Sequence, residues 1–98
     1  MLCIKTTEKC IEIQLKKAIE KAGGFAWKFN SSSRRGVPDR IVFMPGGRIW
    51  FVELKAPGKR PTLLQIKRKN QIEAMGFRVR IIDCLEEVDR FMEEVMQK

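Results

Sequence analysis

The chain has 98 residues, of which 44% are apolar and 33% are charged, and its 20 Lys and Arg against 12 Asp and Glu give a formal net charge of +8. This composition predicts one folded domain over residues 1–98 and excludes a disordered chain. No apolar run reaches the roughly 20 residues of a membrane helix, and the first ten residues show no secretory leader pattern, so we expect a cytoplasmic protein.

The first half of the chain predicts a helix followed by three strands. Apolar residues recur every three to four positions over residues 7–22, and a Gly-Gly pair ends that helical pattern. Residues 25–29 are aromatic and strand-like. Residues 39–44 and 49–55 are two further strand-like runs, and the Pro-Gly-Gly turn between them predicts an antiparallel hairpin.

The second half predicts a helix over residues 62–75, a strand over 78–82 and an amphipathic helix over 85–96. The segment from residue 49 to residue 82 is long enough for a crossover, so its two strands should be parallel neighbours. The expected order is α-β-β-β-α-β-α. The sequence therefore predicts the α/β class, with a small mixed sheet flanked by helices.

Missing residue types restrict the chemistry. The chain contains no His and no Tyr, which excludes imidazole bases, His-metal sites and a tyrosine nucleophile. Cys3, Cys10 and Cys84 are odd in number and have no Cys-x-x-Cys spacing, so we expect reduced thiols rather than a zinc site or a disulfide frame. Any reaction must therefore use carboxylates, lysines, arginines and a bound metal.

Three charged side chains converge at one end of the predicted hairpin. Glu53 and Lys55 lie two residues apart and share a face of their strand. If Phe43 pairs with Ile49, then Asp39 is opposite Glu53 on that same face. Two adjacent carboxylates repel unless a cation lies between them, and Mg²⁺ is the hard divalent ion that such oxygens bind. An internal salt bridge of Lys55 is the alternative.

These residues carry a family resemblance. Gly36-Val37-Pro38-Asp39 followed by Glu53-Leu54-Lys55 resembles the signature of the PD-(D/E)XK nuclease superfamily. The string RRGVPDRIVFMPGGRIWFVELKAPGKRPTLLQ is similar to its VRR-NUC (virus-type replication-repair nuclease) family, and the likeness covers nearly the whole chain. It implies a restriction-endonuclease-like core in a single nuclease domain, of the kind that phages and bacteria carry as a stand-alone chain.

The resemblance implies a metal-dependent phosphodiesterase that uses Mg²⁺ or Mn²⁺. Asp39, Glu53 and the carbonyl of Leu54 would be metal ligands, and Lys55 the catalytic lysine. A glutamate of the first helix completes the family's site. We prefer Glu12, with Glu8, one turn earlier, as the alternative.

Gln65 matches a glutamine that lies near the site in the family. Its spacing from Thr62 also fits a capping box at the start of the helix. The two roles are compatible.

Positive charge is concentrated in residues 34–80, which carry 12 basic and three acidic side chains, whereas residues 81–98 carry two basic and six acidic ones. Such a stretch is typical of a surface that meets polyphosphate, although it can also serve solubility. The basic residues that we expect to contact DNA phosphates are Arg34, Arg35, Arg40, Lys59, Arg60, Lys67, Arg68 and Lys69.

The family resemblance implies an endonuclease selective for branched DNA such as four-way (Holliday) junctions, acting as a homodimer in DNA repair and, if phage-encoded, in the host cytoplasm. We expect the dimer contact on the first helix or on the last, where Phe91, Met92 and Val95 are apolar. We expect Trp27 and Trp50 in the core or in an interface. A non-catalytic nucleic-acid-binding module and a sequence-reading restriction-type enzyme are the alternatives.

Overall fold

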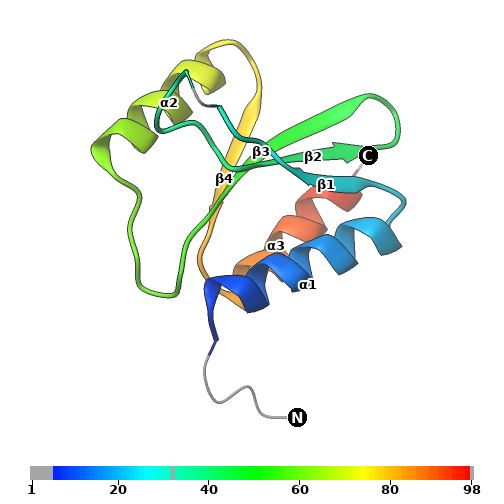
Figure 1. The fold of residues 1–98 in the computed structure, drawn as a ribbon. Coiled ribbons are helices and arrows are strands. Elements are labelled where there is room, and N and C mark those ends of the chain that lie inside the picture. The colour runs from blue at the N-terminus through cyan, green and yellow to red at the C-terminus, as the bar shows by residue number, and fades with distance from the viewer. Residues whose placement is uncertain (1–5, 32, 98) are drawn as a thin grey trace.

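The computed structural model describes residues 6–31 and 33–97, and it has the predicted order of helices and strands (Figure 1). The elements are α1 (Glu8–Lys21), β1 (Phe25–Lys28), β2 (Arg40–Met44), β3 (Arg48–Leu54), α2 (Leu63–Ala74), β4 (Arg78–Ile82) and α3 (Leu85–Met96). The α/β class is confirmed.

The four strands form one mixed sheet in the spatial order β1-β2-β3-β4. The hairpin of β2 and β3 is antiparallel, and Phe43 pairs with Ile49 as predicted. β3 and β4 are parallel, with α2 in the connection between them. The sequence pattern therefore predicted both the pairing and the register correctly.

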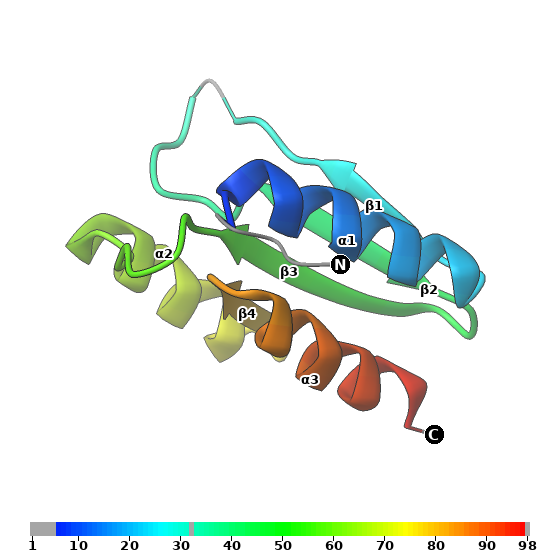
Figure 2. The same ribbon diagram turned by 90° about the horizontal axis from the view of Figure 1, so that it is seen from below.

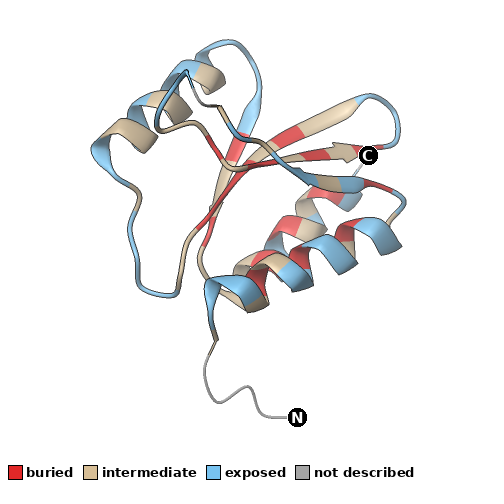
Figure 3. Ribbon diagram, in the orientation of Figure 1, coloured by how far each residue is buried: buried red, intermediate tan, exposed pale blue. Residues whose placement is uncertain are grey.

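α1 and α3 pack against each other and cover the same face of the sheet (Figure 2). The core between them and the sheet is apolar and fully enclosed (Figure 3). Its buried side chains are Ile11, Leu15, Ile19, Val42, Met44, Trp50, Val52, Leu54, Ile82, Val88, Phe91 and Val95. We call the face of the sheet that α1 and α3 cover the inner face.

The core corrects one prediction and narrows another. Phe91 and Val95 are 3% and 0% exposed, and Met92 packs against the core, so the apolar side of α3 is used within the chain and is not a dimer contact. Trp50 is in the core as predicted, whereas Trp27 is 59% exposed on the edge strand β1 and does not belong to the core.

α2 lies on the opposite, outer face of the sheet, next to β4 (Figure 1). None of its residues is buried, and the helix is held by its packing against β4 and by contacts with the loop before Asp39.

No helix within the described residues is both long and apolar enough to cross a membrane. Cys84 forms no disulfide within the described residues, and Cys3 lies outside them.

Candidate active site

Asp39 and Glu53 meet where β2 begins and β3 ends. Arg40 pairs with Val52, which continues the register to place Asp39 beside Glu53. The backbone N–H of Leu54 donates to Oδ1 of Asp39 at 3.2 Å and so holds this carboxylate against β3. The hairpin thus brings together two carboxylates that are 14 positions apart in the chain.

Glu53 is buried, with 7% of its surface exposed, and its two oxygens differ in their partners. Oε2 accepts a hydrogen bond of 2.9 Å from Nε2 of Gln65 and lies 3.6 Å from Nζ of Lys55. Oε1 is buried and has no hydrogen-bond partner among the described residues. Such an oxygen is unfavourable unless a cation or a donor completes it.

The electrostatics of the carboxylate pair reflect this arrangement. Burial, together with the charge of Asp39, raises the pKa of Glu53 to about 7, although Lys55 acts in the opposite direction. Burial also raises the pKa of Asp39, opposed by the hydrogen bond from Leu54. Binding of a proton or a cation is therefore favourable at both carboxylates.

Gln65 connects the site to the first turn of α2. Its Oε1 accepts from the N–H of Thr62 at 2.9 Å, and its own N–H donates to Oγ1 of Thr62 at 3.1 Å, which is the predicted capping box. Because the amide oxygen is engaged there, the amide nitrogen faces Glu53. The capping role and the contact with the site are thus both present in one side chain.

The loop before Asp39 is held against α2. Gly36 has φ +80°, and a Cβ at this position would lie 2.8 Å from Cγ of Leu64, so both the backbone conformation and the close packing require glycine. Arg68 adds a hydrogen bond of 2.9 Å from its Nε to the carbonyl of Arg35. The glycine of the Gly-Val-Pro-Asp motif therefore fixes the approach of the chain to Asp39.

The two candidate glutamates of α1 have different surroundings. Glu12 binds Arg40 and Lys9, and the hydrogen bond from Lys9, reinforced by Arg40, lowers its pKa despite partial burial. The charge of Glu8, by contrast, contributes to the raised pKa of Asp39. Glu8 thus contributes to the electrostatics of Asp39, whereas Glu12 is linked to Asp39 through Arg40, which lies 3.8 Å from Oδ2 of Asp39.

The predicted phosphate contact by Arg40 does not agree with its position. Arg40 alternates with Asp39 along the strand and points to the inner face, where it is 9% exposed and bound to Glu12. It also donates to the carbonyl of Asp39 at 2.9 Å. Arg40 therefore lies on the inner face, largely covered, where it lines a groove between α1 and β1 together with Glu12.

The other predicted basic residues lie on the surface or at its margin. Exposed are Arg34, Arg35, Lys59, Arg60 and Lys67. Arg68 is half-buried through its contact with Arg35, and Lys69 is half-buried in an ion pair of 3.0 Å with Glu73.

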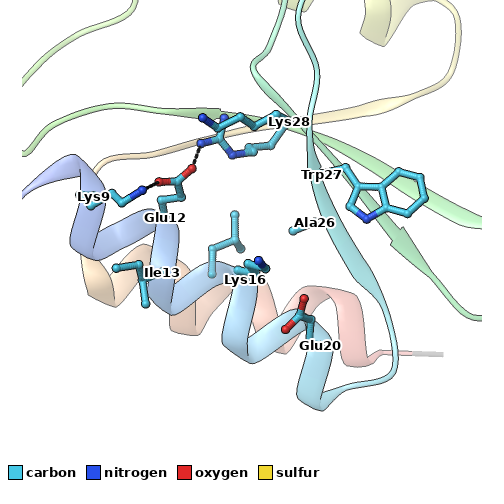
Figure 4. A pocket seen from close by; sticks show the side chains of 10 residues that line it. Lys9, Glu12, Ile13, Lys16, Glu20, Ala26, Trp27 and Lys28 are labelled. Carbon is cyan, nitrogen blue, oxygen red and sulfur yellow. Dashed lines mark hydrogen bonds and ion pairs between the residues drawn. The ribbon is translucent and has the colours of Figure 1, made fainter.

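A groove between α1 and β1 carries basic residues that the sequence analysis missed. Lys9, Lys16 and Lys28 line a volume of about 540 Å³, with Glu12 and Glu20 also on its walls (Figure 4). These lysines all precede the basic central segment in sequence, and the packing of the edge strand against α1 brings them together. The sequence signal for this groove was the spacing of Lys9 and Lys16, which are seven residues apart and therefore lie on one side of the helix.

Asp39 and Glu53 fit a divalent cation. The part of the chain that the structure describes holds no group of three Asp, Glu, His or Cys side chains arranged for a metal. Two carboxylates with water and phosphate oxygens are nevertheless the usual set for Mg²⁺, and Oε1 of Glu53 has no partner here among residues 6–31 and 33–97. The donor set is oxygen-rich, which favours a hard ion over zinc.

A mixed sheet that joins an aspartate before β2 to a Glu-x-Lys at the end of β3 defines a PD-(D/E)XK-type nuclease fold. A solved structure titled "VRR_NUC domain" matches the chain with a TM-score of 0.82 and 29% identity, covering 90% of this chain and 97% of the other. A curated relative, "Putative nuclease p44" of Acyrthosiphon pisum secondary endosymbiont phage 1, is 47% identical over 76 residues, which are 78% of this chain and 82% of the relative. No protein-family model matches the chain. The chain belongs to the VRR-NUC family.

Proposed function

We propose that the protein is a metal-dependent endonuclease that hydrolyses DNA phosphodiester bonds, with residues 1–98 as one nuclease domain. The observation that carries the proposal is the buried Oε1 of Glu53, which has no hydrogen-bond partner in the described part of the chain and lies beside a second carboxylate, Asp39. A purely structural ion pair would have satisfied this oxygen. Membership of a nuclease family supports the same conclusion.

Asp39, Glu53 and the carbonyl of Leu54 would hold Mg²⁺ or Mn²⁺, with Glu12, or Glu8 as the alternative, completing the set from α1. A bound ion of this kind polarises a phosphate and makes a bound water more acidic. Lys55 places an ammonium 3.6 Å from Glu53, where it can stabilise the negative charge that develops on the phosphate. Gln65 holds Oε2 of Glu53, so that Oε1 stays available.

The exposed basic residues around the site would hold phosphates on either side of the cut. Neutralising Lys67, for example by Lys67→Ala, should weaken DNA binding and reduce the slope of log affinity against log salt by about one unit. Titrations of a fluorescent duplex at several salt concentrations measure this slope. An unchanged slope would remove Lys67 from the DNA interface, and Lys17→Ala on α1, also exposed, is the matched control.

We further propose branched DNA, such as four-way junctions in DNA repair, as the preferred substrate, cut in the host cytoplasm by a homodimer. Two related sites are needed for paired cuts, and each chain offers one. A non-catalytic DNA-binding module is the second candidate, but the complete set of Asp39, Glu53 and Lys55 favours catalysis.

The decisive experiment incubates the protein with end-labelled junction, flap, single-stranded and duplex DNA in Mg²⁺, Mn²⁺ or EDTA. We expect cutting with either ion, strongest on the junction, and none in EDTA. Binding without cutting in every ion would support the DNA-binding module. Full activity in EDTA would contradict metal dependence.

A further inference from the structure

The groove between α1 and β1 is a concave surface with an excess of positive charge. Four basic and two acidic residues are among those that line its volume of about 540 Å³ (Figure 4). Lys9 and Lys16 belong to α1, whereas Lys28 is the last residue of β1. The cations therefore come from both walls of the groove, which we call the α1–β1 groove.

The charges in the α1–β1 groove do not cancel one another. Glu12 already binds two cations, Lys9 at 3.1 Å and Arg40. Lys16 and Lys28 are exposed, and neither forms an ion pair with another residue in 6–31 or 33–97. A concave surface strengthens the potential of such ammonium groups, so these two lysines are available to an anion.

The cations occupy one end of the groove. α1 and β1 run in opposite directions, so the start of α1, with Lys9, lies next to the end of β1, with Lys28 (Figure 2). Glu20, in the last turn of α1, lies at the other end (Figure 4). Lys9 and Lys16 are about 10 Å apart along the helix axis, a length that about three nucleotides of one B-DNA strand span.

The cationic end of the groove adjoins the active site. Lys28 pairs with Arg40 across β1 and β2. Nη1 of Arg40 lies 3.8 Å from Oδ2 of Asp39, one of the two site carboxylates. An anion held by Lys28 therefore lies next to the place where we propose that the phosphodiester is cut.

The groove and the basic residues of α2 lie on opposite sides of the active site. The sheet order is β1-β2-β3-β4, and the carboxylates lie where the central strands β2 and β3 meet. α2, which carries the exposed Lys67, packs against β4, whereas the groove follows β1. A polyanion that crosses the active site can therefore contact cations on both sides of it.

The sugar-phosphate backbone of a DNA strand fits these features better than other occupants. Its charges recur along the strand, as the lysines recur along the groove. A second copy of the chain fits poorly, because an isologous contact would set the cationic groove against itself. An acidic peptide would meet the same charges, but only a nucleic acid gives a reason for the groove to adjoin the active site.

We propose that the α1–β1 groove is a second DNA-binding site, which holds about three consecutive phosphates of one strand where that strand leaves the active site. Lys16 and Lys28 supply the charges that phosphates neutralise. This inference rests on the proposed nuclease function and adds a contact surface to it. Because phosphate contacts carry no base information, the groove positions the strand and does not read its sequence.

The test removes equal charge inside and outside the groove. The double variant Lys16→Gln, Lys28→Gln neutralises the groove, whereas Lys17→Gln, Lys21→Gln neutralises two exposed positions of α1 that do not line it. Anisotropy titrations of a fluorescent duplex in EDTA, at several salt concentrations, measure affinity without cleavage. We expect the groove variant to lose about tenfold in affinity and about two units of the slope of log affinity against log salt, one per phosphate contact. The control should lose less than about twofold.

Equal losses in the two double variants would overturn the proposal, because net charge alone would then explain them. An unchanged salt slope in the groove variant would overturn it too, as would normal DNA binding combined with lost binding of a polyglutamate peptide. Far-UV circular dichroism verifies folding, and Lys16→Glu provides a second groove variant. Loss of affinity in the groove variant of a protein that never cuts DNA would refute the nuclease and not the groove.

Discussion

Two glutamates of this chain, the buried Glu53 of β3 and the half-buried Glu94 of α3, have opposite electrostatic surroundings. Glu94 of α3 accepts from Nε and Nη2 of Arg80 at 2.8 and 2.7 Å and from Nε1 of Trp50 at 2.7 Å. Those hydrogen bonds lower its pKa despite partial burial. Glu53 has one amide donor, a more distant ammonium and a raised pKa.

The difference distinguishes Glu94, whose hydrogen bonds are complete, from Glu53, whose hydrogen bonds are not. Every oxygen of Glu94 has a donor, and the result is a fixed link between α3, β3 and β4. Glu53 is more deeply buried, yet one of its oxygens has no partner among the described residues. Since a buried unpartnered carboxylate oxygen costs stability, its presence indicates function.

The sharpest way to break the comparison is to make the same substitution at both glutamates. Glu53→Gln should reduce the single-turnover cleavage rate by about 10³-fold, because it removes a proposed metal ligand, a loss at least as large as that of a transition-state contact. Glu94→Gln should cleave normally but unfold at a lower temperature. Gel-based kinetics at saturating enzyme, together with thermal melts, measure both.

Equal losses of rate at the two positions would mean that Glu53 acts through the fold alone. Asp39→Asn is the second variant, and it should match Glu53→Gln in rate while retaining DNA binding.

The second largest difference is expected between the basic partners of the two glutamates, Lys55 and Arg80. Lys55→Ala should lower turnover by about 10²-fold with little change in DNA affinity, because the ammonium acts on the developing charge. Arg80→Ala should leave turnover intact and lower the free energy of unfolding by about 1 kcal/mol, since Arg80 is partly exposed. Rate, affinity and chemical denaturation are measured in parallel.

Normal cleavage by Lys55→Ala would show that Lys55 serves only as an ion-pair partner of Glu53. Restoration of activity by Lys55→Arg would favour charge over shape at this position.

The smallest expected effect is on stability as a function of pH in metal-free protein. The pKa of Glu53 is raised from 4.5 to about 7, so the folded state holds a proton that the unfolded state releases, and its contribution to stability falls as pH rises between those values. Glu53→Gln should therefore gain on the wild type over this range, by on the order of 2 kcal/mol above pH 7. Glu94, with its lowered pKa, should contribute stability above pH 4.5 that is lost as pH falls further.

Denaturant titrations in EDTA at several pH values measure these differences. A pH-independent gap between Glu53→Gln and the wild type would show that Glu53 keeps its ordinary pKa. Saturating Mg²⁺ should close the gap, because the ion binds the ionised form.

The sequence predicted the fold well because its signals were local. Helical periodicity, two glycine-rich turns and strand alternation placed every element, and the length of the Pro-Gly-Gly turn fixed the register that joins Asp39 to Glu53. The same alternation could have placed Arg40 on the inner face. We instead predicted a DNA contact for Arg40 because it is adjacent in sequence to Asp39.

What the sequence left open depends on long-range packing. Glu8 and Glu12 are one turn apart on α1, and only the rotation of that helix against β2 distinguishes them. An amphipathic α3 fits a core or a dimer equally well, and burial of Val88 and Val95 decides for the core.

The double use of Gln65 has a consequence for motion. α2 buries none of its residues, and helix ends of this kind open and close readily. When the first turn of α2 frays, the Thr62 contacts and the donor to Glu53 are lost in the same event. The amide of Gln65 therefore holds Glu53 only while the first turn of α2 is formed. Hydrogen exchange of the Gln65 backbone amide measures how often this turn opens.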